Sequence, residues 1–346
     1  EIEYEYIDFS PNFVNELSGG PTGWSAPEQG SSASQVLTPL WVPESYVLQG
    51  TESSIDTQGG EWTRLRYTDG VETMMVLQGH EQATARLTPD GGLELRVGVH
   101  SHGQGLETTL AQIANTVLGI ENDKVKVILG DTGQTPYSTG TWGSRCTVMA
   151  GGAVTRACRE IAGRVARIGA HLLQPEVENI TVEGGEAKGP TGRVSLREIA
   201  EVWYMRPQDL PANVDPSGLE ITAGYKPLRD TGTFSYAAHA AVVAVDTELG
   251  DVEILDYAVV EDGGVLINPM IVDGQVFGGT AQGIGTALYE EMPFDKSGQP
   301  LASTLADYLL PGASEIPHIR IEHMTTPSPY SEFGVKGIGE GGAIGP

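Results

Sequence analysis

The hydrophobic and polar positions of this chain follow a regular pattern only from about Val76 onward. Short runs that resemble half-buried strands are separated by turn residues such as the Pro-Asp-Gly of residues 89–91. Between them lie longer segments whose apolar residues recur every three or four positions, as on one face of a helix. The pattern predicts strands at 83–87, 93–99, 124–129, 237–246 and 252–261, a short hairpin within 180–194, and helices at 106–117, after residue 145 and from 196 to about 202.

The alternation of hairpins with helices predicts an α+β fold rather than a parallel, doubly wound sheet. Gly119 is placed to end one helix in the left-handed conformation, and Ser195 with Glu198 predicts a capping box at the start of another. Residues 1–75 contain turn-rich patches and no sustained period of 2 or 3.6, so they predict an irregular segment without an assigned function. Residues 205–232, rich in proline and glycine, predict a long connection.

The composition is that of a globular protein. The chain has 346 residues and 39% hydrophobic content, enough for two or three compact cores. No apolar run approaches the roughly 18 residues that span a bilayer, and residues 1–20 lack the features of a signal peptide, so no membrane span is expected. The net charge of -26 argues against nucleic acid and anionic membrane as partners, because their phosphates would be repelled.

The chain contains two cysteines, Cys146 and Cys158, in neither a C-x-x-C nor a zinc spacing. An iron–sulfur cluster takes about four thiolates, so this chain is not expected to carry one. Cys158 falls on the apolar face of its predicted helix and is expected in the core. The low cysteine content fits a reducing compartment, and we expect the protein in the cytoplasm.

Four glycine-rich segments each contain side chains that can form hydrogen bonds. Three of them adjoin predicted helix starts, where free backbone N–H groups favour an anionic ligand. We therefore predict a large, polar, phosphate-bearing cofactor. For the last segment, a plain glycine-rich surface loop is the alternative interpretation. The segments are Gly103-Gln104-Gly105, residues 139–145 with Thr141, Ser144 and Arg145, the loop-to-helix junction 273–285 with Gln275 and Gln282, and residues 334–345 with Glu340.

Other kinds of site find less support in the sequence. A module for a simple dinucleotide would need a Rossmann fingerprint, but the glycines of 279–285 do not follow a strand in that spacing. His100, His102 and His239 lack a partner set at metal-ligand spacing. His100 and His102 alternate at the end of a strand, so a solvated pair or a supporting role suits these two better. Ser144 has no His-Asp pair in a motif context, which argues against a serine hydrolase.

The order of the glycine-rich motifs resembles a known family. The chain is similar to the molybdenum-binding subunit of the xanthine dehydrogenase/aldehyde oxidase family, above all to bacterial large subunits of the carbon monoxide dehydrogenase type. The resemblance covers about residues 76 to 346. It rests on Gly103-Gln104-Gly105, Gly130-Asp131-Thr132, Gly140-Thr141, Ser144-Arg145, Ile267-Asn268-Pro269, Gly274-Gln275, Gly278-Gly279, Gln282-Gly283-Ile284-Gly285 and the run from Gly334 to Ile344.

The resemblance implies a molybdopterin cofactor, often its cytosine dinucleotide form in bacteria, with molybdenum held by the cofactor's own dithiolene and not by the protein. It implies oxidative hydroxylation of an aldehyde or aromatic N-heterocycle with water as the oxygen source. Glu340 would be the catalytic base that deprotonates a hydroxyl group at the metal. The implied cofactor-binding residues are Gly103, Gln104, Gly105, Thr141, Gly143, Ser144, Arg145, Gly278, Gly279 and Gln282.

The resemblance also implies partners. Electrons would leave through iron–sulfur and FAD groups on separate subunits. A full catalytic subunit of the family has two molybdenum-cofactor domains and is about twice this length, and residues 76–346 resemble the second. We therefore expect a truncated chain or one piece of a split subunit, inactive without the remaining half, which carries the substrate-selecting loop. The alternative is a non-catalytic structural piece that binds partner chains.

Overall fold

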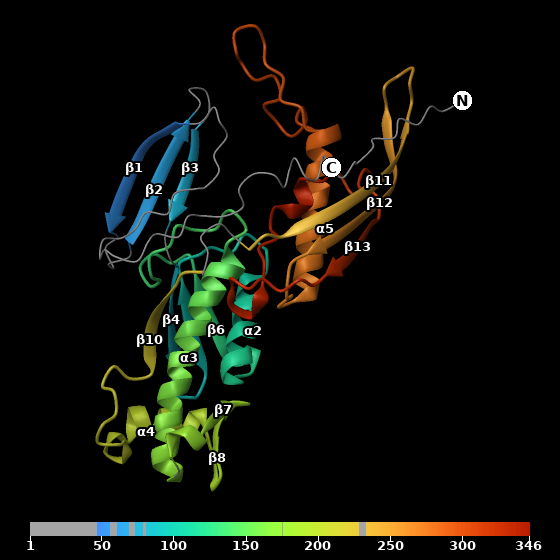
Figure 1. Ribbon diagram of the computed structural model, residues 1–346. Coiled ribbons are helices and arrows are strands. Elements are labelled where there is room, and N and C mark those ends of the chain that lie inside the picture. Colours follow the sequence, from blue (N-terminus) through green and yellow to red (C-terminus); the bar gives the residue numbers. More distant parts are fainter. Residues whose placement is uncertain (1–46, 56–60, 69–72, 79–80, 175, 228–232) are drawn as a thin grey trace. The chain divides into compact units, whose positions relative to one another are not determined.

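The computed structural model describes residues 47–55, 61–68, 73–78, 81–174, 176–227 and 233–346. The chain divides into two compact units, Glu1–Gly79 and His80–Pro346, which we describe separately. In the first unit, strands β1 (Val47–Ile55), β2 (Glu61–Thr68) and β3 (Thr73–Gln78) form an antiparallel sheet in the order β1-β2-β3 (Figure 1).

This small sheet corrects part of the expectation that residues 1–75 are irregular. Each strand pairs with its neighbour in sequence, for example Ser54 opposite Trp62 and Leu65 opposite Val76. The sequence of β1 is Val-Leu-Gln-Gly-Thr-Glu-Ser-Ser-Ile, without a regular alternation of apolar and polar residues. Backbone pairing with β2 defines the strand, so a search for hydrophobic period could not find it. Residues 1–46 of the predicted segment lie outside the described residues.

The larger core of the second unit lies between a four-stranded sheet and two helices. β4 (Glu81–Leu87) and β5 (Leu93–Val97) form the predicted hairpin, in which Thr88 N donates to Gly92 O at 2.8 Å. β6 (Val125–Leu129) runs parallel to β5. Helices α2 (Leu106–Leu118) and α3 (Cys146–Leu173) pack side by side over this sheet (Figure 1). Fully buried members of the core include Leu87, Leu95, Leu110, Ile113, Val154, Cys158 and Ile161.

Two predicted helix ends are confirmed in atomic detail. Gly119 caps α2 with φ of 70°, and the Ser195 side chain forms a capping box with Glu198 at the start of α4 (Leu196–Met205). The predicted short hairpin is a three-stranded sheet. Its strands are β7 (Thr181–Glu183), β8 (Glu186–Gly189) and β9 (Gly192–Ser195).

Short 3₁₀ turns occur along the whole second unit. They are η1 (Asn122–Lys124), η2 (Val177–Asn179), η3 (Pro207–Asp209), η4 (Glu332–Gly334) and η5 (Gly341–Ala343).

The predicted long connection 205–232 contains a strand, so that prediction is wrong in its middle. β10 (Glu220–Tyr225) pairs antiparallel with β4 and completes the four-stranded sheet in the order β10-β4-β5-β6. Its buried residues, Ile221, Ala223 and Tyr225, alternate with exposed ones. The period of two is present in the sequence, but proline and glycine on both sides hide it.

The second sheet of this unit carries the C-terminal part of the chain. β11 (Tyr236–Val245) and β12 (Val252–Asp262) are antiparallel, and β13 (Ile319–Met324) runs parallel to β12, in the order β11-β12-β13. Helix α5 (Pro269–Leu288) packs against β12 and β13 (Figure 1). Their shared core is formed by Tyr257, Val259, Val276, Ile284 and Ile319. Separate sheets with helices packed on them confirm the α+β fold.

Residues 273–285 are the middle of α5, and the expected loop-to-helix junction does not exist there. The helix begins earlier, where the Asn268 side chain accepts a hydrogen bond from Ile271 N at 3.1 Å. Glycine destabilises a helix in isolation, so a glycine-rich run predicted a loop. Tertiary packing outweighs that propensity here, because a Cβ at Gly279 would lie only 3.1 Å from Gly342 Cα. Across the described ranges, we find no helix with the length and apolar character that crossing a membrane requires.

Candidate active site

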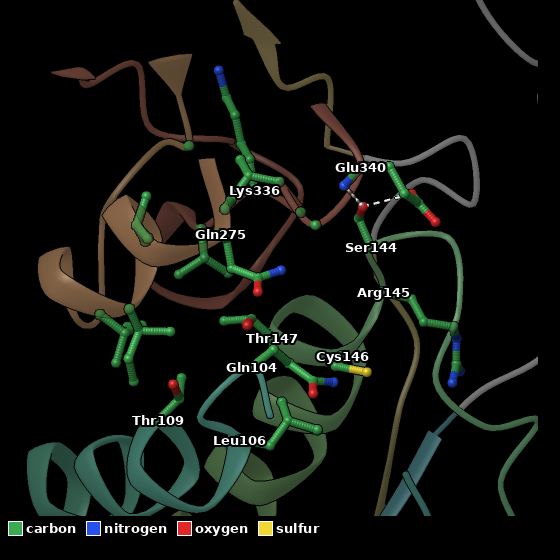
Figure 2. Close-up of a pocket in the computed structure, with 18 of the residues that line it drawn as sticks. Gln104, Leu106, Thr109, Ser144, Arg145, Cys146, Thr147, Gln275, Lys336 and Glu340 are labelled. Atoms are coloured by element: carbon green, nitrogen blue, oxygen red, sulfur yellow. Dashed lines mark hydrogen bonds between the residues drawn. The ribbon is translucent and has the colours of Figure 1, made fainter. Parts of the chain in front are cut away.

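A cavity of about 580 Å³ lies within the second unit (Figure 2). Its volume is within the range of small-molecule and cofactor pockets, roughly 300–1,000 Å³. Four stretches that are distant in sequence form its wall: residues 102–109 at the start of α2, 141–147 at the start of α3, 263–275 leading into α5, and 335–340. Three of these stretches belong to the glycine-rich segments that the sequence singled out. Of the remaining segment, residues 273–285, Gln275 and Gln282 line the cavity.

Glu340 is held at the cavity by Ser144. The Ser144 hydroxyl donates a hydrogen bond to Glu340 Oε2 at 2.6 Å, and the Glu340 backbone N–H donates to Ser144 Oγ at 3.1 Å (Figure 2). The two contacts fix both the side chain and the backbone of Glu340, although it is separated from Ser144 by 196 residues. Glu340 remains solvent-exposed, so its carboxylate can meet a ligand from the cavity.

The backbones of Gly337 and Ser144 lie so close together that position 337 requires a glycine. A Cβ built on Gly337 would lie 2.0 Å from the carbonyl oxygen of Ser144, far inside van der Waals contact. Ser144 itself adopts a φ of 53°, a left-handed conformation that non-glycine residues adopt infrequently. The loop before α3 therefore turns sharply and presents its backbone directly to the C-terminal loop.

A buried ion pair anchors the C-terminal loop to the second sheet. Lys336 Nζ lies 3.0 Å from Asp262 Oδ1, and both side chains are almost inaccessible to solvent. Burial alone would raise the pKa of Asp262, but hydrogen bonds from Thr326, Gly264 and Lys336 outweigh it and hold that pKa well below its usual range. Asp262 is therefore an anion at neutral pH, and it fixes the residue from which the loop of Gly337 and Glu340 departs.

A second buried ion pair holds the loop before α3. Arg145 Nη1 lies 2.9 Å from Glu81 Oε2 and also donates to Gly140 O at 2.8 Å. Ser138 Oγ donates to the same Glu81 oxygen at 2.9 Å. Burial raises the pKa of Glu81, although Arg145 and Ser138 oppose that rise. The guanidinium of Arg145 is thus bound to Glu81 and Gly140, which form part of the support of the cavity wall.

Thr141 connects the loop before α3 to the loop after β5, and Gln104 is held within the latter loop. The Gln104 carbonyl oxygen accepts a hydrogen bond from His102 N. The Thr141 hydroxyl donates to His100 O at 2.6 Å and accepts from His100 N at 2.8 Å. The amide groups of Gln104 and Gln275 extend into the cavity (Figure 2). These two amides offer both a donor and an acceptor to a ligand.

The structure brings together most of the predicted site residues. Those that line the cavity are Gly103, Gln104, Thr141, Ser144, Arg145, Gln282 and Glu340. Four predicted glycines do not line it. Gly105 packs under Ile271, because a Cβ built on Gly105 would lie 2.6 Å from Ile271 Cδ1. Gly143 and Gly278 have open space around them, and Gly279 packs against Gly342.

Sequence reasoning missed three buried carboxylates near the site: Glu81, Glu261 and Asp262. Each lies at the end of a strand where apolar residues precede or follow it, and Glu261 continues the buried alternation of Tyr257 and Val259. For Glu81 and Glu261, a charged residue at a position that the strand period places on the buried face was the available signal.

Glu261 lies beneath the C-terminal loop without a polar partner. It is fully buried, and neither carboxylate oxygen has a hydrogen-bond partner within the described ranges. A Cβ built on Gly341 would lie 2.9 Å from Glu261 Oε1, so the carboxyl group touches the loop next to Glu340. Burial raises the pKa of Glu261 to about 7, against an opposing effect of His323 and with a further rise from Asp262.

Comparison with known proteins identifies the class. The sequence family of molybdopterin cofactor-binding domains matches residues 46–317, and the chain belongs to this family. The match begins within the first unit, upstream of the segment that showed the resemblance in sequence. It ends before the loop of Glu340, so the role of that residue stays a prediction.

Individual relatives agree with the family. The chain is 38% identical over 267 residues to the carbon monoxide dehydrogenase large chain of Hydrogenophaga pseudoflava, covering 75% of this chain and 32% of that protein. It is 38% identical over 268 residues to the nicotine 6-hydroxylase large subunit of Paenarthrobacter nicotinovorans, covering 77% and 32%. This chain thus spans about a third of the length of these relatives.

Solved structures show the same fold. Quinoline 2-oxidoreductase from Pseudomonas putida 86 superimposes with a TM-score of 0.71 at 38% identity, covering 77% of this chain and 34% of that one. Cu,Mo-CO dehydrogenase gives 0.71 at 34% identity, covering 77% and 33%. The resemblance to the molybdenum-binding subunits of the xanthine dehydrogenase/aldehyde oxidase family is confirmed, and the relatives are oxidoreductases.

Proposed function

We propose that this chain is the cofactor-binding part of the large subunit of a cytoplasmic molybdenum hydroxylase, in which Glu340 is the catalytic base. The observation that carries the proposal is the carboxylate of Glu340, exposed at a polar cavity and fixed there by two hydrogen bonds with Ser144.

The cavity fits a large polar cofactor. Its volume of about 580 Å³ suits such a ligand, and the amides of Gln104 and Gln275 can pair with the ring edge of a pterin. The start of α2 lines the same cavity and provides unpaired N–H groups for a phosphate. Within the described ranges, no group of three or more His, Cys, Asp or Glu side chains could hold a metal ion. A metal that arrives bound to the cofactor's own ligands suits this donor set.

Residues of this chain would bind the cofactor, and one of them, Glu340, would accept a proton. When bound, the molybdenum cofactor supplies the oxidation–reduction chemistry of the hydroxylation. Glu340 would accept a proton that originates from the water used in the reaction. The Ser144 hydroxyl occupies Oε2 of Glu340, so Oε1 is the oxygen available for that proton.

The names of the relatives support the finer points of the proposal. Nicotine 6-hydroxylase and quinoline 2-oxidoreductase are named for aromatic N-heterocycles, so we propose this substrate class ahead of aldehydes. Relatives named as a large chain, a large subunit and a complex subunit support partner chains. We propose an iron–sulfur subunit and an FAD subunit as electron acceptors, the remaining part of the molybdenum subunit as the other wall of the site, and the cytosine dinucleotide as the cofactor form. Two cysteines, both free and buried, support a reducing compartment.

The test is Glu340→Gln in the assembled enzyme. A base role predicts a loss of kcat of roughly 10²-fold or more, with the molybdopterin content of the purified protein unchanged. Glu322→Gln, an exposed position on β13, is the matched control and should leave kcat as it is. Unchanged turnover in Glu340→Gln would instead favour a structural piece that binds partner chains without chemistry.

A further inference from the structure

The outer end of the β11–β12 hairpin forms an apolar arm. We define the arm as residues 242–255, which comprise the end of β11, the turn 246–251 and the start of β12. In Figure 1 the turn of the arm stands clear of α5. Six large apolar side chains of the arm have exposed fractions between 38% and 76%: Val242, Val243, Val245, Leu249, Val252 and Leu255.

The apolar residues lie on both faces of the arm. Val242 and Val243 are consecutive on β11, so their side chains point to opposite faces, and each is about half exposed. The core that α5 forms with the sheet begins at Tyr257 on β12, with Ile254 at its margin, and most of the arm extends beyond it. A ribbon that is apolar on both faces and open to water is typical of a surface that another protein covers.

The arm is already shaped without its partner. Asp246 N donates to Asp251 O at 2.9 Å, and Gly250 N donates to Asp246 O at 2.7 Å. The Asp246 side chain accepts from the backbone of Glu248 at 2.8 Å and of Leu249 at 3.0 Å. The turn therefore holds residues 243–245 paired with 252–254, and docking would cost little conformational entropy.

The charge of the arm restricts its partner. Asp246, Glu248, Asp251 and Glu253 are acidic, and residues 242–255 contain no lysine or arginine. A complementary surface has an apolar centre and a basic rim. A second copy of this chain is a poor candidate, because it carries the same acidic arm and a net charge of -26.

We propose that the arm inserts into the remaining part of the molybdenum subunit, the part of the large chain that lies outside these 346 residues. The inference rests on the proposed function. This chain corresponds to only 32% of the carbon monoxide dehydrogenase large chain, so a protein of that size has ample additional surface to cover the arm. The partner segment carries an apolar groove bordered by Lys or Arg.

The strand that carries the arm packs against the end of the Glu340 loop. His239 lies on β11 next to the arm, and a Cβ built on Gly345 would lie 2.2 Å from the His239 ring. Gly345 follows η5, which begins directly after Glu340. Docking of the arm therefore fixes the strand against which the end of the Glu340 loop packs.

Site-specific crosslinking tests the proposal in the complete enzyme. Benzoylphenylalanine replaces Leu249 at the tip of the arm, the enzyme is purified from its own host, and crosslinked peptides are identified by mass spectrometry. We expect peptides of the molybdenum subunit from outside residues 1–346, at a yield at least about tenfold above that for the same probe at Met205. Met205 is as exposed as Leu249 but lies on α4. Crosslinks to a second copy of this chain or to the iron–sulfur or FAD subunit, or a yield equal to the control, would overturn the proposal.

A charge variant gives a second measurement. Val243→Glu changes an exposed position of the arm, so the fold should persist, as circular dichroism will show. We expect it to lower the crosslinking yield of the probe at Leu249 by at least about tenfold, whereas Met205→Glu leaves that yield unchanged; an equal yield overturns the proposal. Molybdopterin content is measured on the unsubstituted enzyme. An enzyme without molybdopterin refutes the proposed function, whereas a loaded enzyme whose arm crosslinks elsewhere refutes only the docking site.

Discussion

Replacing Glu261 by Gln should stabilise the protein at alkaline pH and much less at acidic pH. Glu261 is fully buried, and its oxygens have no hydrogen-bond partner among the residues with described positions. Ionisation of this group in the folded state therefore places an uncompensated charge under the Glu340 loop. Gln has nearly the same shape as a protonated Glu and cannot ionise, so the substitution removes the charge and leaves the packing intact.

The magnitude follows from the pKa difference. The Glu261 pKa is raised from 4.5, its ordinary value, to about 7 in the folded protein. Between these values the folded state keeps a proton that the unfolded state has released, so the free energy of unfolding falls as pH rises. The contribution of this group is fully present below pH 4.5 and is lost as pH rises through 7. At about 1.4 kcal/mol per pKa unit, the loss between about pH 5 and about pH 8 is roughly 2–3 kcal/mol.

The assay is urea denaturation followed by circular dichroism at about pH 5 and about pH 8. The difference in unfolding free energy between Glu261→Gln and the unsubstituted chain should increase by roughly 2–3 kcal/mol in favour of the variant between these pH values. Glu253→Gln, an exposed position on the same strand, is the control and should show no such increase. A difference that is equal at both pH values would refute the reasoning, since it would mean that Glu261 titrates alike in the folded and unfolded states.

Three further substitutions test the contacts that build the site. Ser144→Ala removes the hydrogen bond to Glu340. Because hydrogen bonds to charged groups contribute about 1.5–3 kcal/mol, steady-state kinetics of the assembled enzyme should show kcat lowered by about tenfold or more. An unchanged kcat would contradict this role. Gly337→Ala places a Cβ 2.0 Å from Ser144 O, so the thermal unfolding midpoint should fall. Gly163→Ala is the comparison and should not lower it, because Gly163 lies in α3 with open space around it. Lys336→Met leaves the Asp262 charge unpaired and should cost about 3–5 kcal/mol in urea denaturation, much of it recovered when Asp262→Asn is added; no loss would show that the pair is not needed.

Local elements of the fold could be predicted from the sequence because their signals are short-range. The hairpin before α2, the cap at Gly119 and the capping box at Ser195 each depend on a few consecutive residues, and all three are confirmed. The strand β10 was missed because proline and glycine on both sides hide its period of two. Helix α5 was misread because its glycines serve contacts with η5 that no local propensity records.

The candidate site was predictable as a set of segments but not as a geometry. The glycine-rich segments with Gln104, Ser144 and Glu340 do meet at one cavity. The contact between Ser144 and Glu340 could not be derived, because nothing in either segment specifies the other. The buried ion pair of Lys336 with Asp262 was also out of reach, since a sequence does not show which charges become desolvated.

The Ser144–Glu340 contact also has a consequence for the order of assembly. It joins residues 196 positions apart, and the entropic cost of closing a chain segment rises with its length. The hairpin and helices of the larger core can form from neighbouring segments, whereas this contact must wait until the second sheet has found its place. We expect the cavity to remain open on one side until late in folding. A bulky cofactor can enter during that interval, before the second sheet brings Glu340 to Ser144.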